Sequence, residues 1–199
     1  MKSRKQAELI KSLTEKEIIL SVIFTQVILL IIASILSPFF LKDWHSFLRF
    51  FQWDFKWVFI GVISGLVVVC IDLFLMNRLP QRFYDDGGIN KKIFANLNFV
   101  QMIGLVLIVA IAEEWLFRGI IQTKFGLIPT SIIFSVIHMR YWTHWYLIVN
   151  IFVLSVWIGL VFEWSGQLLW PVIFMHFIID FLLGISIRLN AKRKVGNEV

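Results

Sequence analysis

Two adjacent carboxylates and an arginine lie inside an otherwise apolar stretch of this chain: Glu113, Glu114 and Arg118. Glu114 and Arg118 share one face of a helix in the favourable order, with the acid before the base. Glu113 points about 100° away from Glu114 on the same helix. The group has two interpretations. It anchors a helix end in the lipid headgroups, or it supplies a carboxylate for acid–base chemistry.

Two histidines in other apolar stretches favour the chemical interpretation. His138 lies in one stretch, and His176 lies in another with Asp180 one helical turn later, where the carboxylate can fix the orientation and tautomer of the imidazole. A charged side chain at the centre of a membrane helix costs roughly 2.5–3.5 kcal/mol, so several on separate spans need a reason.

The depths of these groups in a membrane agree with a shared cavity. At about 1.5 Å per helical residue, Glu113, His138 and His176 lie roughly 9, 16 and 12 Å from the ends of their spans on one membrane side. The sequence therefore predicts that they meet in one layer.

Two histidines and a glutamate could also bind Zn²⁺ and leave one position for water. We expect a site without a cofactor, with zinc as the alternative.

The composition indicates a lipid environment for these elements. Hydrophobic residues make up 59% of the chain and mean hydropathy is +0.82, whereas soluble domains contain about 45–50% apolar residues. About 20 apolar residues suffice to cross a hydrocarbon core of ~30 Å. We therefore predict an all-α fold, a polytopic transmembrane helix bundle of about six spans, at residues 18–40, 57–76, 98–119, 127–139, 145–162 and 168–187.

The predicted spans divide the chain into an N-terminal part with two spans and their loop, a core with the polar groups, and a loose basic tail, at residues 1–97, 98–187 and 188–199. The aromatic and charged segment 41–56 is typical of an additional interfacial helix. Gly61 and Gly65 form a pair of small residues that can seat a neighbouring helix.

The positions of the basic residues predict the orientation and the surroundings of the protein. Of the 19 lysines and arginines, 14 fall in the two terminal segments and in loops on the same side of six spans, and five fall on the other side. This asymmetry places both termini in the cytoplasm of a multi-pass cell-membrane protein. The net charge of +6 is spread in short clusters between apolar runs, so the expected partner is the lipid bilayer and no nucleic acid is expected.

Three motifs carry a resemblance to a known family. Residues 113–119 match EExxxR-G, residues 134–138 match FxxxH, and residues 176–180 match HxxxN/D. In this order and spacing they resemble the CPBP family, which comprises CAAX prenyl proteases type 2 and bacteriocin-processing enzymes and is also called Abi. The resemblance covers about residues 98–182.

The resemblance implies a role for each motif residue. Glu113 and His138 would activate a water molecule, and His176 and Asp180 would stabilise the oxyanion. Glu114 and Arg118 would hold the architecture of the site or guide the substrate. Asp180 departs from the asparagine that is frequent in the family, because an ionised carboxylate cannot donate a hydrogen bond. Asp180 is therefore either protonated or limited to orienting His176.

The resemblance implies an intramembrane endopeptidase that cleaves a membrane-associated protein or peptide. The alternative is a membrane scaffold or bacteriocin self-immunity protein that uses the same fold without proteolysis. The complete set of six polar residues favours the enzyme, since a scaffold has no need for costly polar groups in the membrane.

Overall fold

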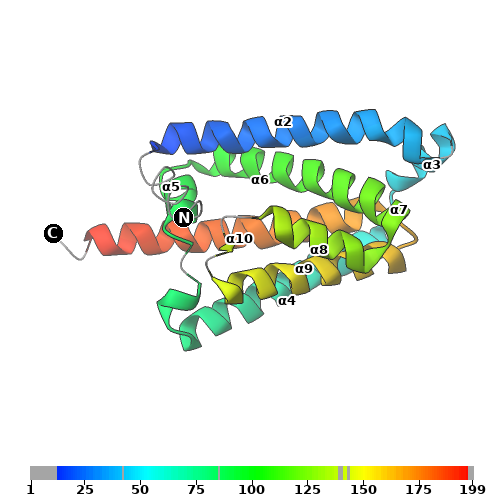
Figure 1. The fold of residues 1–199 in the computed structure, drawn as a ribbon. Helices are drawn as coiled ribbons and strands as arrows, with labels where there is room; N and C mark the ends of the chain where they lie inside the picture. Colours follow the sequence, from blue (N-terminus) through cyan, green and yellow to red (C-terminus); the bar gives the residue numbers. More distant parts are fainter. Residues whose placement is uncertain (1–12, 42, 85, 139–140, 143, 197–199) are drawn as a thin grey trace.

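The computed structural model describes residues 13–41, 43–84, 86–138, 141–142 and 144–196, and its regular elements within these ranges are all helical (Figure 1). The longer helices and the short ones between them, in chain order, are α2 (Glu15–Phe40), α3 (Trp44–Phe50), α4 (Phe55–Arg78), η1 (Gln81–Phe83), α5 (Ile89–Phe94), α6 (Phe99–Glu114), η2 (Trp115–Gln122), α7 (Thr123–Phe125), α8 (Leu127–Ile137), α9 (Trp145–Trp164) and α10 (Leu169–Gly196).

The predicted helical membrane bundle is confirmed. Within the described residues, five helical stretches are long and apolar enough to cross a membrane: α2, α4, the continuous stretch 99–125 formed by α6, η2 and α7, α9, and α10. The sixth predicted span is the shorter helix α8, whose 11 residues extend about 16 Å at 1.5 Å per residue. Since a hydrocarbon core is about 30 Å thick, α8 alone is too short to cross it.

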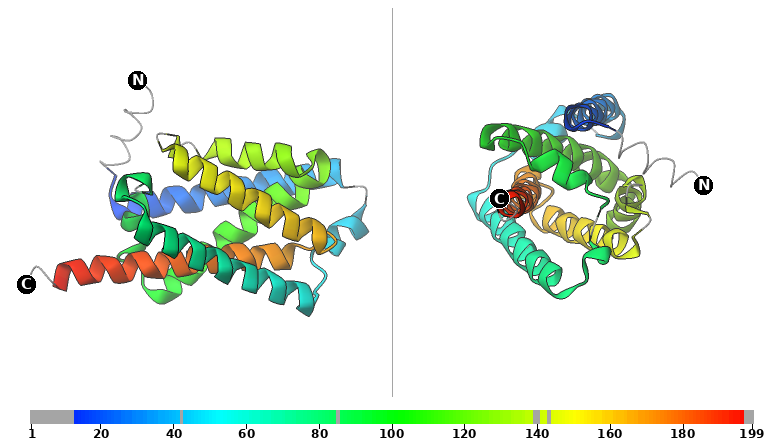
Figure 2. Two further views of the ribbon diagram at one scale, coloured as in Figure 1. Left: turned by 90° about the horizontal axis from the view of Figure 1, so that it is seen from below. Right: turned by 90° about the vertical axis from the view of Figure 1, so that its left-hand side faces the viewer.

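The helices run alongside one another between two ends of the molecule. The beginning of α2, the helix α5 and the end of α10 lie at the same end, and α3 and α7 lie at the other (Figures 1 and 2). The stretch from α6 to α7 lies beside α2 and runs in the same direction, and α8 turns back along the bundle. This arrangement returns the chain to the first end before α9 begins.

Local capping signals determine where the helices next to the site begin. Asn98 caps α6 by accepting a hydrogen bond from the backbone of Gln101 at 2.8 Å, and the Gln101 side chain accepts one from the backbone of Asn98 at 3.0 Å. Thr14 and Glu17 form the same reciprocal pair at the start of α2. A capping box of this type satisfies two backbone donors that a helix start otherwise leaves unpaired.

The predicted role of the two glycines in helix packing is confirmed. Gly61 of α4 lies against the backbone of Pro171, and Gly65 lies against the backbone of Met175 on α10. A Cβ atom at Gly65 would lie 2.9 Å from the Met175 carbonyl oxygen, which is closer than side chains pack. The missing side chains therefore allow α10, which carries His176 and Asp180, to lie close to α4.

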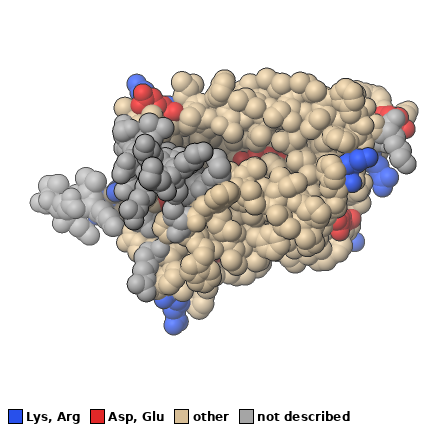
Figure 3. All heavy atoms as spheres, in the orientation of Figure 1, with Lys and Arg blue, Asp and Glu red and all other residues tan. Residues whose placement is uncertain are grey.

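The outer surface has the polarity expected of a membrane protein. In the face shown in Figure 3, charged side chains gather at the two ends, and a broad belt between them is almost free of charge. Large apolar side chains such as Phe24 and Phe59, both 65% exposed, lie on the outside of the bundle. The tail that we expected to be loose instead continues α10 as a helix to Gly196.

Candidate active site

Glu114 connects the first predicted motif to the third. Its side chain is completely buried. One carboxylate oxygen, Oε2, accepts a hydrogen bond from Nε of Arg118 at 3.0 Å, and the other, Oε1, lies 2.7 Å from Nδ1 of His176. The pair between Glu114 and Arg118 is therefore present as predicted. The contact with His176, 62 positions later in the chain, is an addition that helical spacing could not reveal.

Arg118 is completely buried, and its guanidinium has several hydrogen-bond acceptors around it. In addition to Glu114, its guanidinium donates to Oγ of Ser155 at 3.1 Å and, over a longer distance of 3.4 Å, to Oε1 of Gln122. The guanidinium also lies over the ring of Phe134, 5.4 Å from the ring centroid. This burial rules out the interpretation that Arg118 anchors a helix end among lipid headgroups.

The backbone around Arg118 departs from α-helical geometry. Residues 115–122 form the π-helical segment η2, which continues α6 without a break. Segments of this type inside α-helices are frequent at functional sites. The carbonyl of Arg118 accepts a hydrogen bond from the side chain of Thr123 at 3.1 Å. The first motif therefore crosses from an α-helix into a π-helix between Glu114 and Arg118.

His176 lies between two carboxylates. Its Nδ1 contacts Glu114, and its Nε2 lies 3.5 Å from Oδ2 of Asp180, one turn further along α10. The shorter contact identifies Glu114 as the principal orienting partner of the imidazole. The predicted pairing with Asp180 is present at a distance too long for a strong hydrogen bond. The Asp180 side chain is 36% exposed, whereas the His176 side chain is 9% exposed.

Phe134 links the second motif to the first. Its ring packs edge-on against Phe117, with the centroids 4.9 Å apart, and it covers Arg118. His138 follows at the end of α8, with its ring centroid 4.6 Å from that of Phe134. The Nδ1 atom of His138 lies 2.6 Å from the carbonyl oxygen of Phe134. When Nδ1 donates this hydrogen bond, Nε2 is the unprotonated nitrogen of the imidazole, the form that can act as a base.

Glu113 differs from its neighbour in its access to solvent. Its relative exposure is 8%, whereas that of Glu114 is 0%. The two carboxylates therefore have separate positions: Glu114 is enclosed by its partners, and Glu113 lies at the boundary of the packed interior.

The zinc alternative can be tested on the side chains present. Among the described residues, no three His, Cys, Asp or Glu side chains lie in an arrangement that could hold a metal ion. The one exposed thiol of that part of the chain, Cys70, belongs to α4.

Two partners of Arg118 were not anticipated from the sequence. Gln122 follows Arg118 by four residues, so the same helical spacing that paired Glu114 with Arg118 could have identified it. Its amide also donates to the Gly159 carbonyl at 2.9 Å and to Glu163 at 3.2 Å. Ser155 lies on another helix, and no local pattern in the sequence indicates its role.

The comparisons with known proteins identify the family of this chain. Residues 95–182 match the family described as type II CAAX prenyl endopeptidase Rce1-like. The chain is also 37% identical over 171 residues to the uncharacterized protein YpbD of Bacillus subtilis (strain 168), an alignment that covers 85% of this chain and 90% of that protein. No solved structure matches the chain. On these grounds the chain is a multi-pass membrane protein that belongs to the Rce1-like family of type II CAAX prenyl endopeptidases.

Proposed function

We propose that this protein is an intramembrane endopeptidase that hydrolyses a peptide bond of a membrane-associated protein or peptide. The observation that carries the proposal is the double contact of Glu114 with Arg118 and His176. It ties the first motif to the third, and the packing of Phe134 on Arg118 ties the second motif to both. The membership of a peptidase family supports the same activity.

In the proposed reaction, Glu113 and His138 activate a water molecule. Glu113 is the more exposed of the two adjacent carboxylates, and it takes a proton from the water as the oxygen forms a bond to the peptide carbonyl carbon. The same proton is then delivered to the departing amide nitrogen, so the C–N bond breaks to release an amine and a carboxylic acid. His138 orients the water through the nitrogen that does not face Phe134.

His176 is proposed to stabilise the oxyanion that forms on the peptide carbonyl. An imidazolium held at Nδ1 by Glu114 can donate from Nε2 to this oxygen. Asp180 is proposed to orient His176, because an ionised carboxylate is no donor. Glu114 and Arg118 are proposed to position these groups without touching the substrate. The proposed reaction uses no metal ion.

The test compares peptides released from membranes that contain the wild-type protein, Glu113→Gln or His138→Ala. We expect each substitution to lower the cleavage rate by at least about 100-fold, the usual contribution of a general base. Thr130→Val serves as the control for loss of fold, since Thr130 is buried and its hydroxyl bonds to the Gly126 carbonyl, outside the proposed site. Undiminished cleavage by Glu113→Gln would refute the mechanism. Cleavage that stops in a chelator would contradict the metal-free proposal.

The same variants separate the enzyme from the scaffold alternative. In a strain that lacks the gene, a scaffold should restore the phenotype without Glu113, whereas an enzyme should not. The proposed localisation is the cell membrane with both termini in the cytoplasm, because 14 of the 19 basic residues lie on that side of the predicted spans.

A further inference from the structure

One polar side chain of α2 differs from all the others in that helix. Ser21, Thr25, Ser34 and Ser37 each donate to a backbone carbonyl three or four residues earlier in α2, at 2.7–2.8 Å. Gln26 is 4% exposed, and its carbonyl oxygen has no hydrogen-bond partner among the described residues. A buried amide oxygen without a partner is costly and calls for a functional explanation, most of all inside a membrane.

Gln26 lies on the face of α2 that packs against the motif helix. It shares the buried stripe of α2 with Ile18 and Ala33. Ile18 belongs to the same apolar cluster as Met102 of α6, and Ala33 belongs to the cluster of Leu116, Phe117 and Phe134. The position of Gln26 between these two contacts places it beside the stretch between Met102 and Leu116, which includes the two glutamates near its end.

The depth of Gln26 is close to that of the proposed base. The two helices run in the same direction (Figure 1), so distances along them can be compared from the shared cluster of Ile18 and Met102. At 1.5 Å per residue, Gln26 lies about 12 Å beyond Ile18, and Glu113 lies about 16 Å beyond Met102. The two side chains are therefore within about one helical turn of each other in depth.

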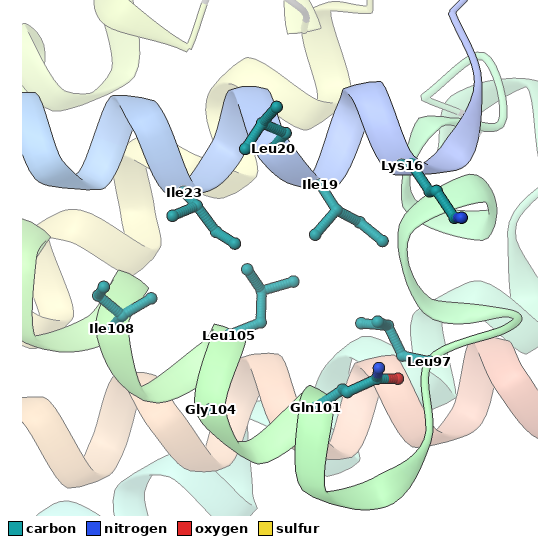
Figure 4. A pocket seen from close by; sticks show the side chains of 9 residues that line it. All are labelled: Lys16, Ile19, Leu20, Ile23, Leu97, Gln101, Gly104, Leu105 and Ile108. Carbon is teal, nitrogen blue, oxygen red and sulfur yellow. The ribbon is translucent and has the colours of Figure 1, made fainter.

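An apolar pocket leads along the two helices toward Gln26. Its volume is about 540 Å³, and Figure 4 shows Ile19 and Ile23 of α2 facing Leu105 and Ile108 of α6 across it. Gln26 follows Ile23 by three residues, which is just under one turn. A substrate segment whose apolar side chains occupy this pocket thus reaches the level of Gln26 about one helical turn beyond Ile23.

A peptide bond can be attacked only after the substrate leaves its helical conformation at that point. In a lipid environment each backbone N–H and C=O that is freed in this way costs several kcal/mol unless it finds a partner. A carboxamide contains one acceptor and a donor group, as a peptide group does, so it can pair with both. We propose that Gln26 binds the unwound backbone of the substrate beside the scissile bond, an inference that rests on the endopeptidase function proposed above.

The test replaces the amide by an apolar group of similar volume, Gln26→Met, in the full-length protein in proteoliposomes. The probe is a synthetic peptide with the sequence that wild-type membranes cleave in the peptide-release experiment described under the proposed function. We expect kcat/KM to fall about tenfold, chiefly through KM, because contacts to substrate that persist in the transition state act on KM. The midpoint of thermal unfolding should stay the same or rise, since a buried group without a partner is removed.

Thr25→Val is the matched control, because Thr25 is the adjacent polar residue and its hydroxyl bonds to its own helix at 2.8 Å. This variant should leave KM unchanged. An unchanged KM for Gln26→Met, or a lower midpoint of unfolding, would overturn the inference, the second because it would reveal a structural partner for the amide. Glu113→Gln separates the two proposals: if it abolishes cleavage while Gln26→Met has no effect, only the role of Gln26 is wrong.

Discussion

At the scale of single residues, the site depends on one carboxylate with two charged or chargeable partners. Glu114 is enclosed, and both of its oxygens are occupied, by Arg118 and by His176. Arg118 in turn has acceptors from its own helix and from Ser155 of α9. The fold tolerates a buried arginine as long as the arginine keeps all of its partners. Removal of one partner leaves an uncompensated charge in a low-dielectric interior.

We therefore predict that Glu114→Gln lowers the free energy of unfolding by about 3–5 kcal/mol, the usual cost of breaking a buried ion pair. Cleavage should also be lost, since His176 loses its closest orienting partner. Chemical unfolding in detergent measures the first effect. Glu163→Gln is the control, because Glu163 is an exposed carboxylate that accepts a hydrogen bond from Gln122 at 3.2 Å. Equal losses of stability in the two variants would contradict the importance assigned to Glu114.

At the scale of elements, α10 is positioned by close contact with α4. Gly61 and Gly65 face the backbone of α10, and the same helix brings His176 to Glu114 on α6. The distance between α4 and α10 therefore affects the site even though α4 contributes none of the proposed catalytic side chains.

This packing predicts opposite effects of the same substitution at two glycines. Gly61→Ala forces a Cβ atom against the Pro171 carbonyl and should destabilise the protein by about 1–3 kcal/mol, as overpacking does. Gly104→Ala should instead stabilise it by roughly 0.5–1 kcal/mol, because a helical Gly is unfavourable and, apart from the adjacent residues and backbone of its own helix, no described atom lies within 4 Å of the added Cβ. Thermal unfolding of both variants measures the two signs, and a shift in the same direction would refute the packing argument.

At the scale of the whole molecule, the charge distribution and the direction of the helices jointly define two membrane sides. Most of the charged groups visible in Figure 3 lie at the ends of the bundle. The short helix α8 is too short to span a bilayer, but it returns the chain far enough for α9 to start beside η1, where Phe83 contacts Trp145 with centroids 6.1 Å apart. The helix α9 therefore begins at the end of the bundle where the six-span count of basic residues assumes it.

This arrangement predicts the labelling of single cysteines introduced into a Cys70→Ser background. Asn90→Cys, at the end where α10 terminates, should react with a membrane-impermeant maleimide from the cytoplasmic side. Lys124→Cys, at the opposite end in α7, should react from the other side. Gel-shift labelling of intact cells and inverted vesicles measures both. Reaction of both cysteines from one side would show that the predicted orientation does not hold.

The sequence alone determined those features that depend on local spacing or composition. An apolar content of 59% requires lipid as the solvent, and helical periodicity pairs Glu114 with Arg118 and identifies the two packing glycines. Motif spacing was sufficient to name the family. The tertiary structure decided which distant groups meet: the contact of Glu114 with His176, that of Arg118 with Ser155, and the cover that Phe134 provides. Such contacts depend on how whole helices pack, and no interval along the chain encodes that packing.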